Sequence, residues 1–254
     1  MITITREDNK ELMSRYPDNY FDLAIVDPPY GILNKTKRGG DRKFNMKEYS
    51  QWDVKPTTEY FDELFRVSKN QIVWGGNYFG ELWLKSEYNK GYIIWDKNQP
   101  ETLNNFSMAE MAWNSLDRPS KIFRYSVRKN RNKTHPTQKP VELYAWLLGM
   151  YAKEGDRILD THLGSGTIAI ACYKARFNLT ACEISKDYFE SSKKKIESVV
   201  PKEAIQANAK DSFSINFPDQ KNPMDKSYAV YKEHLEQLQL FAEKEELYVP
   251  DSKG

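Results

Sequence analysis

The chain has 254 residues, of which 39% are hydrophobic and 29% charged, and its formal net charge is +2. This length suits one α/β domain with an insertion and is too short for two full domains and a linker; the small net charge does not by itself indicate a nucleic-acid partner. No stretch approaches 18 apolar residues, so we expect no membrane span, no signal peptide and a cytoplasmic location. The chain has only three histidines and no Cys-x-x-Cys pattern, so we expect no metal site.

The first informative feature is the turn Asp27-Pro28-Pro29-Tyr30, which follows a predicted buried strand at residues 22–26. Neither proline has an N–H and each restricts φ, so the chain must leave the strand at its carboxyl end. Open α/β sheets place their ligands at that edge. A carboxylate, carbonyls without competing N–H groups and an aromatic ring can together bind a planar base by its exocyclic amino group.

The middle of the chain alternates helical and extended patterns. We predict a helix over 57–68, strands over 71–74, 92–95 and 108–113, and a helix over 140–152. Two basic runs follow the turn in sequence, and the second, from Arg118 to Lys139, contains no Asp or Glu. Each run alone could be a solvated surface, but clustered Lys and Arg neutralise phosphates, and their position favours DNA binding. The candidate DNA contacts are Lys37, Arg38, Arg124, Arg128 and Arg131.

A second motif begins at a predicted strand over 157–160. It continues through Gly164 and Gly166 into an apolar helix over 168–175 and a strand over 179–182. Glycines let the backbone pass close to a ligand, and the N–H groups of the following helix favour negative charge. Glu183 comes 19 residues after Gly164, a spacing suited to binding ribose hydroxyls.

The rest of this half is less informative. Cys172 and Cys182 fit buried thiols in a reduced compartment better than a disulfide, which their even number still permits. An amphipathic helix is predicted over 186–200, residues 211–224 are polar, and an apolar stripe over 226–247 indicates a helix that packs on its own domain rather than on a second subunit.

Together these motifs resemble the S-adenosylmethionine-dependent amino-methyltransferases of DNA. The order of D-P-P-Y first and the glycine motif last is that of the permuted β group, and residues 134–143 (T-H-P-T-Q-K-P-V-E-L) are similar to the stretch before the family's cofactor strand. The resemblance covers about residues 5–195. It implies an α/β, Rossmann-like methyltransferase sheet with helices on both faces, circularly permuted motif order and a small target-recognition insertion. We expect a catalytic domain over 1–205, with target recognition over 96–133, and a C-terminal extension with a helix over 206–254.

By the same resemblance, the catalytic turn is Asp27, Pro28, Pro29 and Tyr30. The cofactor contacts would be Asp8, Asp27, Lys139, Asp160, His162, Gly164, Gly166 and Glu183, with S-adenosylmethionine as the cofactor. His162 departs from the family, which usually has Asp-Pro-Phe where this chain has Asp160-Thr161-His162. Whether His162 contacts the cofactor or only packs stays open.

The function that the resemblance implies is site-specific methylation of adenine N6 in duplex DNA. Cytosine-N4 methylation is the alternative within the family, where Ser is more frequent in place of Asp27. A non-catalytic DNA-binding regulator on the same fold is the alternative from another class, and RNA is a weaker alternative as substrate. The recognised DNA sequence, a homodimer and a cognate restriction endonuclease all stay open, and no membrane partner is expected.

Overall fold

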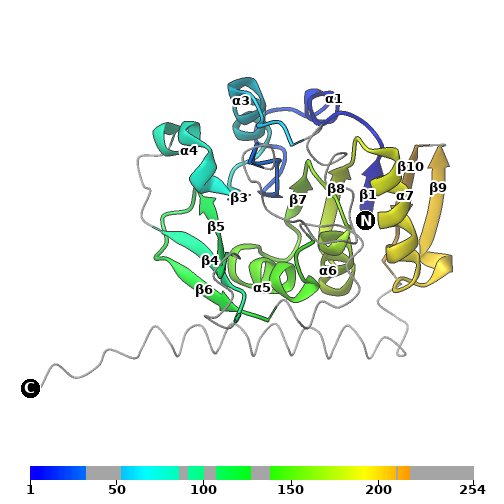
Figure 1. The fold of residues 1–254 in the computed structure, drawn as a ribbon. Helices are drawn as coiled ribbons and strands as arrows, with labels where there is room; N and C mark the ends of the chain where they lie inside the picture. Colours follow the sequence, from blue (N-terminus) through cyan, green and yellow to red (C-terminus); the bar gives the residue numbers. More distant parts are fainter. Residues whose placement is uncertain (33–52, 86–90, 100–106, 127–137, 210, 218–254) are drawn as a thin grey trace, which may run out of the picture.

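The computed structural model describes residues 1–32, 53–85, 91–99, 107–126, 138–209 and 211–217. Ten strands in these ranges form one sheet in the order β6-β4-β5-β3-β2-β7-β8-β1-β10-β9 (Figure 1). Their bounds are β1 Ile2–Thr5, β2 Leu23–Val26, β3 Gln71–Trp74, β4 Tyr92–Asp96, β5 Ala109–Asn114, β6 Lys121–Arg124, β7 Arg157–Asp160, β8 Asn178–Cys182, β9 Ile205–Ala209 and β10 Ser212–Ile215.

The centre of the sheet is parallel and its two ends contain antiparallel pairs. Strands β3, β2, β7, β8 and β1 run parallel to one another, whereas β5 is antiparallel to β3 and β10 is antiparallel to β1. Strand β2 pairs directly with β7, Leu23 opposite Ile158 and Ala24 opposite Leu159. The segments after these two strands, which are the D-P-P-Y turn and the glycine motif, therefore leave the sheet side by side.

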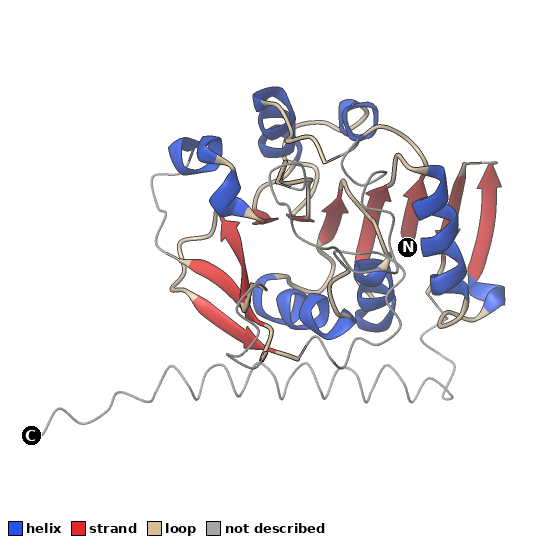
Figure 2. Ribbon diagram, viewed as in Figure 1, coloured by secondary structure: helices blue, strands red, loops and turns tan. Residues whose placement is uncertain are grey.

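Helices cover both faces of this sheet (Figure 2). On one face lie α5 (Val141–Tyr151), α6 (Thr167–Ala175) and α7 (Lys186–Glu197), and on the other lie α1 (Asn9–Ser14), α3 (Thr58–Val67) and α4 (Gly80–Lys85). Short 3-10 helices occur at Gly76–Tyr78 (η2) and Lys202–Ala204 (η4). Strand side chains alternate between the two layers: Ile25 packs with α5 and α6, whereas Val26 packs with α1 and α3. The predicted Rossmann-like methyltransferase fold is confirmed in this arrangement.

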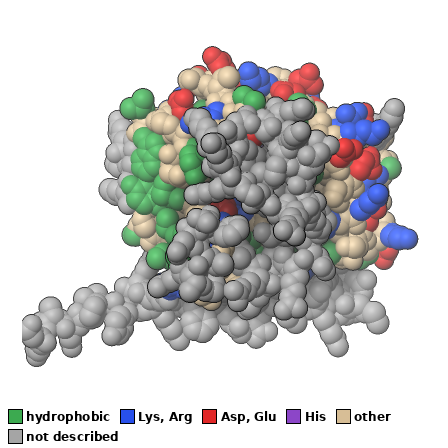
Figure 3. Space-filling model, in the orientation of Figure 1, with side chains coloured by type: hydrophobic (Ala, Val, Ile, Leu, Met, Phe, Trp, Pro, Cys, Tyr) green, Lys and Arg blue, Asp and Glu red, His purple; other side chains and the backbone are tan. Residues whose placement is uncertain are grey.

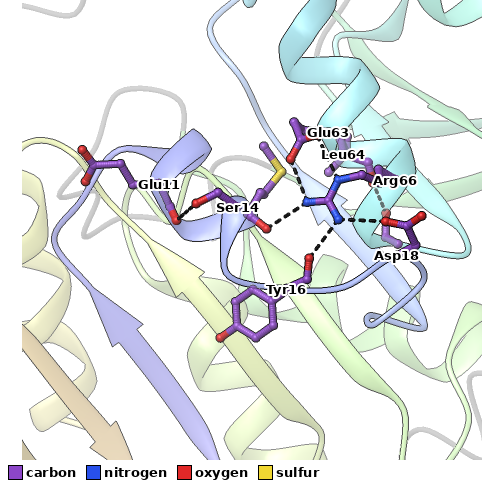
Figure 4. A network of polar contacts seen from close by, with 9 residues as sticks. Glu11, Ser14, Tyr16, Asp18, Glu63, Leu64 and Arg66 are labelled. Atoms are coloured by element: carbon purple, nitrogen blue, oxygen red, sulfur yellow. Dashed lines mark hydrogen bonds and ion pairs between the residues drawn. The ribbon is translucent and has the colours of Figure 1, made fainter.

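One arginine ties α1 to α3 at the segment that leads into β2 (Figure 4). Nη1 of Arg66 donates to the carbonyl of Tyr16 and to Oδ1 of Asp18, both at 2.9 Å. Nη2 donates to the carbonyl of Met13 at 3.2 Å and to Oε2 of Glu63 at 2.8 Å. Because these bonds satisfy the carbonyls at the end of α1, they fix the path of the chain toward the catalytic turn.

The structure differs from the sequence-based expectation at the two ends of the sheet. Residues 96–133, expected to form an inserted recognition region, contribute β5 and β6 to the sheet itself. Beyond the predicted boundary at residue 205, β10 pairs with β1, so the sheet continues into the expected C-terminal extension. Strands β1, β6, β9 and β10 were not predicted, because each has only four or five residues with polar side chains among the apolar ones. The predicted helix over 226–247 lies outside the described residues.

Other expectations concern the surface and the thiols. Cys172 and Cys182 are both free and buried. Among the described residues, no helix has the length and apolar character needed to span a membrane. Figure 3 shows hydrophobic side chains gathered on the side of the molecule where α4 and β4 lie, whereas charged side chains are frequent on the side of α7.

Candidate active site

A cavity of about 890 Å³ lies at the carboxyl ends of β2 and β7. Asp27, Pro28, Pro29 and Tyr30 line it after β2, and His162, Leu163, Gly164 and Ser165 line it after β7. Lys139 and Glu183 complete the predicted residues in its wall. The structure thus brings most of the predicted catalytic and cofactor residues into one site, although the two motifs are more than 130 residues apart in sequence.

In the glycine motif, the loop is held by the carboxylate of Glu183, the residue that follows β8. The N–H of Gly164, whose φ is +54°, donates to Oε2 of Glu183 at 2.9 Å, and the N–H of Ser185 donates to Oε1 at 2.9 Å. Burial raises the pKa of Glu183, while these backbone bonds favour its ionised form. Glu183 therefore shapes the loop around the cavity and keeps oxygen lone pairs that a ribose hydroxyl can use.

Three of the predicted cofactor residues do not line the cavity. Gly166 begins α6 with φ +73°, and a Cβ there would lie 3.1 Å from Cβ of Ser192, so this glycine serves the packing of α6 on α7. Asp8 caps α1, accepting from the N–H of Lys10 at 2.8 Å. Asp160 is 2% exposed and accepts from the N–H of His162 at 3.0 Å; burial raises its pKa to about 8.

His162 is part of a polar chain that joins the glycine motif to α1 and α3. Its Nε2 accepts from the side-chain amide of Asn9 at 3.2 Å, and its Nδ1 lies 2.9 Å from Oγ1 of Thr161, which in turn lies 2.7 Å from the hydroxyl of Tyr60. With Nε2 accepting, Nδ1 carries the proton and donates to Thr161. Burial lowers the pKa of His162 to about 4, so the ring is neutral near pH 7.

On the catalytic side, the D-P-P-Y turn is held by bonds from both sides of its carboxylate. The hydroxyl of Tyr30 donates to Oδ1 of Asp27 at 2.6 Å, and Nζ of Lys139 donates to Oδ2. The ring of Tyr30 lies against the backbone of Gly75, where an added Cβ would come within 2.2 Å of its Cε1. Tyr78 stacks on the same ring, with centroids 5.1 Å apart and planes at 20°. Glycine at 75 therefore allows Tyr30 its place beside Asp27.

Lys139 is 1% exposed and also lies 3.3 Å from Oε2 of Glu110. The other oxygen of Glu110 is 2.7 Å from Nζ of Lys97. Burial lowers the pKa of Lys139, but the carboxylates of Asp27 and Glu110 outweigh it and the pKa is raised. Burial likewise raises the pKa of Glu110, and the two ammonium groups outweigh it, so that pKa is lowered. Lys139 and Glu110 are therefore both charged at neutral pH.

Comparison with known protein families shows to which family the chain belongs. Residues 68–194, which are half of the chain, match the model of the N6/N4 methyltransferases, described as DNA methylase. The chain belongs to this family.

Individual relatives and solved structures are similar to this chain. The DNA methylase is 27% identical over 224 residues to the type II methyltransferase M.HpaI of Haemophilus parainfluenzae, covering 71% of this chain and 69% of the relative. The crystal structure of M1.HpyAVI with SAM is similar with a TM-score of 0.54 at 20% identity, covering 78% of this chain and 100% of the other. The cytosine-N4-specific PvuII methyltransferase has a TM-score of 0.53 at 12% identity, covering 92% and 93% of the two chains. At these identities, the two solved structures show a common fold.

The predicted DNA contacts of the DNA methylase fall mostly outside the described residues. Lys37, Arg38, Arg128 and Arg131 lie there. Arg124 is exposed on β6, with its Nε 3.5 Å from Oδ2 of Asp96. Arg118, in the same basic run, donates to the carbonyl of Met150 at 2.7 Å and lies over the ring of Tyr151. At least part of this run therefore stabilises the protein itself.

Several residues of the site were not singled out from the sequence of the DNA methylase. Lys97, Glu110, Tyr78 and Gly75 line the cavity with the catalytic turn. Glu110 had a detectable signal, because it is the one acidic residue in the otherwise apolar stretch from Met108 to Trp113. Lys97 and Tyr78 had none, since lysine and tyrosine are common at the surface ends of strands and helices.

Proposed function

We propose that this DNA methylase transfers a methyl group from S-adenosylmethionine to N6 of adenine at specific sites in duplex DNA. One observation carries the proposal: Asp27 and Pro28 line the same cavity as Gly164 and Glu183. A base-binding turn and a nucleoside-binding loop that share one cavity can bring an amino group and a methyl donor together. The donor and the target base would then enter from two sides.

The cavity has the size and the chemistry for the donor. Its volume, about 890 Å³, lies in the upper part of the range of small-molecule sites, which extends from about 300 to 1,000 Å³. Glu183 would bind the ribose hydroxyls, and the loop at Gly164 and Ser165 would pass close to the rest of the nucleoside. His162, held neutral by Asn9 and Thr161, would form part of the wall. The bound donor supplies an electrophilic methyl group on a sulfonium.

The target amino group needs help, because its lone pair is delocalised into the ring. Asp27 and the carbonyl of Pro28 would each accept one of its N–H bonds, drawing the nitrogen toward tetrahedral geometry. An ionised carboxylate has about four lone-pair sites, so Asp27 can accept this bond while keeping those from Tyr30 and Lys139. The fixed negative charge also stabilises the positive charge that develops on nitrogen. The methylated, cationic amine then loses its proton readily to solvent.

The base must reach this pocket out of the duplex. Enzymes that modify a base inside DNA flip the nucleotide out, at a cost of about a few kcal/mol in lost stacking. Tyr30 and Tyr78 lie stacked at the wall of the cavity and offer aromatic surface that would offset part of this cost. Because M.HpaI is a type II methyltransferase, a cognate restriction endonuclease is part of the same proposal.

Asp27 favours adenine over cytosine-N4, because the family more often has Ser at this position in the cytosine-N4 enzymes. The fold does not discriminate, since the cytosine-N4-specific PvuII enzyme shares it. An intact carboxylate, a hydrogen-bonded Tyr30 and a formed glycine loop support catalysis over a binding-only regulator.

The test is methyl transfer with labelled S-adenosylmethionine to unmethylated duplex DNA, followed by digestion and separation of the nucleosides. We expect label in N6-methyl-2′-deoxyadenosine and none in N4-methyl-2′-deoxycytidine. Asp27→Asn, which keeps the shape of the side chain but removes its charge, is the matched control and should transfer far less. Label only in cytosine would overturn the adenine assignment, and labelled RNA with unlabelled DNA would overturn the substrate class.

A further inference from the structure

Near the catalytic turn, the cavity is lined by a row of side chains with alternating charges. From the catalytic turn it runs through Asp27, Lys139, Glu110 and Lys97, and the neutral hydroxyl of Tyr30 donates to Asp27 at its near end. The exposed fractions of the four charged side chains are 15% for Asp27, 1% for Lys139, 24% for Glu110 and 14% for Lys97. All of them line the cavity.

The far end of this chain comes from a different part of the sheet. Glu110 lies on β5 opposite Trp95 of β4, and Lys97 follows β4, with its N–H donating to the carbonyl of Met108 at 2.9 Å. Both belong to residues 96–133, the range expected to recognise the target. Lys139, which precedes α5, is the link between these strands and Asp27.

Lys139 has little freedom in this arrangement. Its ammonium lies between two carboxylates and 5.1 Å from the centroid of the Trp74 ring. A buried cation needs partners because desolvation of the charge is costly, and loss of one partner shifts it toward the other. Without the charge of Glu110, Lys139 would move closer to Asp27 and compete with the target amino group for its oxygens.

We propose that Glu110 is a positioning residue for methyl transfer: it holds Lys139 so that Asp27 stays oriented toward the target amino group. The proposal rests on the proposed function in one respect, which is that Asp27 accepts a hydrogen bond from the target amino group. It does not depend on the choice between adenine and cytosine. Glu110 acts through Lys139, whereas its bond to Lys97 holds it in place.

The alternative is that Glu110 only neutralises Lys97, as a structural ion pair. A double-mutant cycle separates the two roles. The variants are Glu110→Gln, Lys97→Met and the double variant. If Glu110 served only Lys97, removal of both charges would restore activity. If Glu110 acts through Lys139, the double variant stays as impaired as Glu110→Gln alone.

The experiment measures total labelled methyl transferred to duplex DNA in a single turnover, with wild type and all variants in parallel. We expect Glu110→Gln to slow transfer about tenfold or more, since misplacement of a reacting group by about 1 Å can cost about 100-fold. The affinity for S-adenosylmethionine, measured by calorimetry, should change less than about twofold. The matched control is Asp62→Asn, which breaks an exposed ion pair with Lys85 away from the cavity and should leave transfer unchanged.

Two results would overturn the proposal: wild-type rates in Glu110→Gln, or wild-type rates in the double variant. If Glu110→Gln does not fold because Lys97 is left without its carboxylate, the double variant lacks that defect and tests the proposal by itself. Wild-type protein that methylates cytosine would contradict the adenine assignment alone, because the measurement counts label in any base.

Discussion

Gly75 offers a sharp test of how the catalytic turn is built. Its φ is +68°, and an added Cβ would lie 2.2, 2.5 and 2.6 Å from three ring atoms of Tyr30. Carbon atoms in contact prefer about 3.5–4.0 Å, so Gly75→Ala must displace the ring by about 1 Å or more. That shift would break the 2.6 Å bond from the Tyr30 hydroxyl to Asp27. We expect kcat to fall about 100-fold, or about 2.7 kcal/mol in activation free energy.

The control separates this displacement from backbone strain. Gly155 has φ +90° and no atom within 4 Å of an added Cβ. Gly155→Ala and Gly75→Ala each require a conformation that costs an L-residue about 1–2 kcal/mol. In a chain of this size both should lower Tm by about 2–8 °C. The two variants should therefore differ in kcat, which steady-state methyl transfer measures, while thermal unfolding shows a lower Tm in both. A Gly75→Ala variant with the kcat of Gly155→Ala would refute the reasoning.

Three further predictions concern other parts of the site. Asp27→Ala should abolish methyl transfer while calorimetry shows cofactor binding largely intact, whereas Gly164→Val should weaken cofactor binding by steric block; near wild-type turnover in Asp27→Ala would contradict the role of this carboxylate. Single alanine changes at Arg124, Arg128 or Arg131 should raise the Kd for duplex DNA without changing cofactor affinity, and at a phosphate contact the salt slope should fall by about 1. If the triple alanine variant kept the wild-type DNA affinity and salt slope, these arginines would form only a solvated face. The pKa of His162 is lowered to about 4 in the folded chain, against about 6.5 in the unfolded chain. Between these values the unfolded state binds more protons, so the stability that this group contributes is lost as pH falls through that window. The free energy of unfolding in urea should therefore fall less from pH 7 to pH 4.5 in His162→Phe than in wild type, and an identical pH dependence would argue against a buried neutral ring.

The family, the central strands and the two motifs could all be predicted from the amino-acid sequence. The strand before Asp27 is a continuous apolar run that is followed by two prolines, and the strand before the glycine motif has the apolar pair Ile158 and Leu159 at its centre. Such apolar segments are buried in parallel sheets. The dipeptide Pro28-Pro29 places a turn at the end of β2 for a local steric reason. Properties that depend on a few neighbouring residues could therefore be predicted.

Contacts between residues that are far apart in the sequence depend on the tertiary structure. The pairing of β2 with β7 brings Asp27 beside the glycine loop, and the pairing of β4 with β5 brings Lys97 and Glu110 toward Lys139. No local pattern encodes these contacts, because they depend on strand order and register across the sheet. The same holds for the glycines: Gly164 lines the cavity while Gly166, two residues later, packs against α7. Their φ angles are alike, and only the elements around them give them different roles.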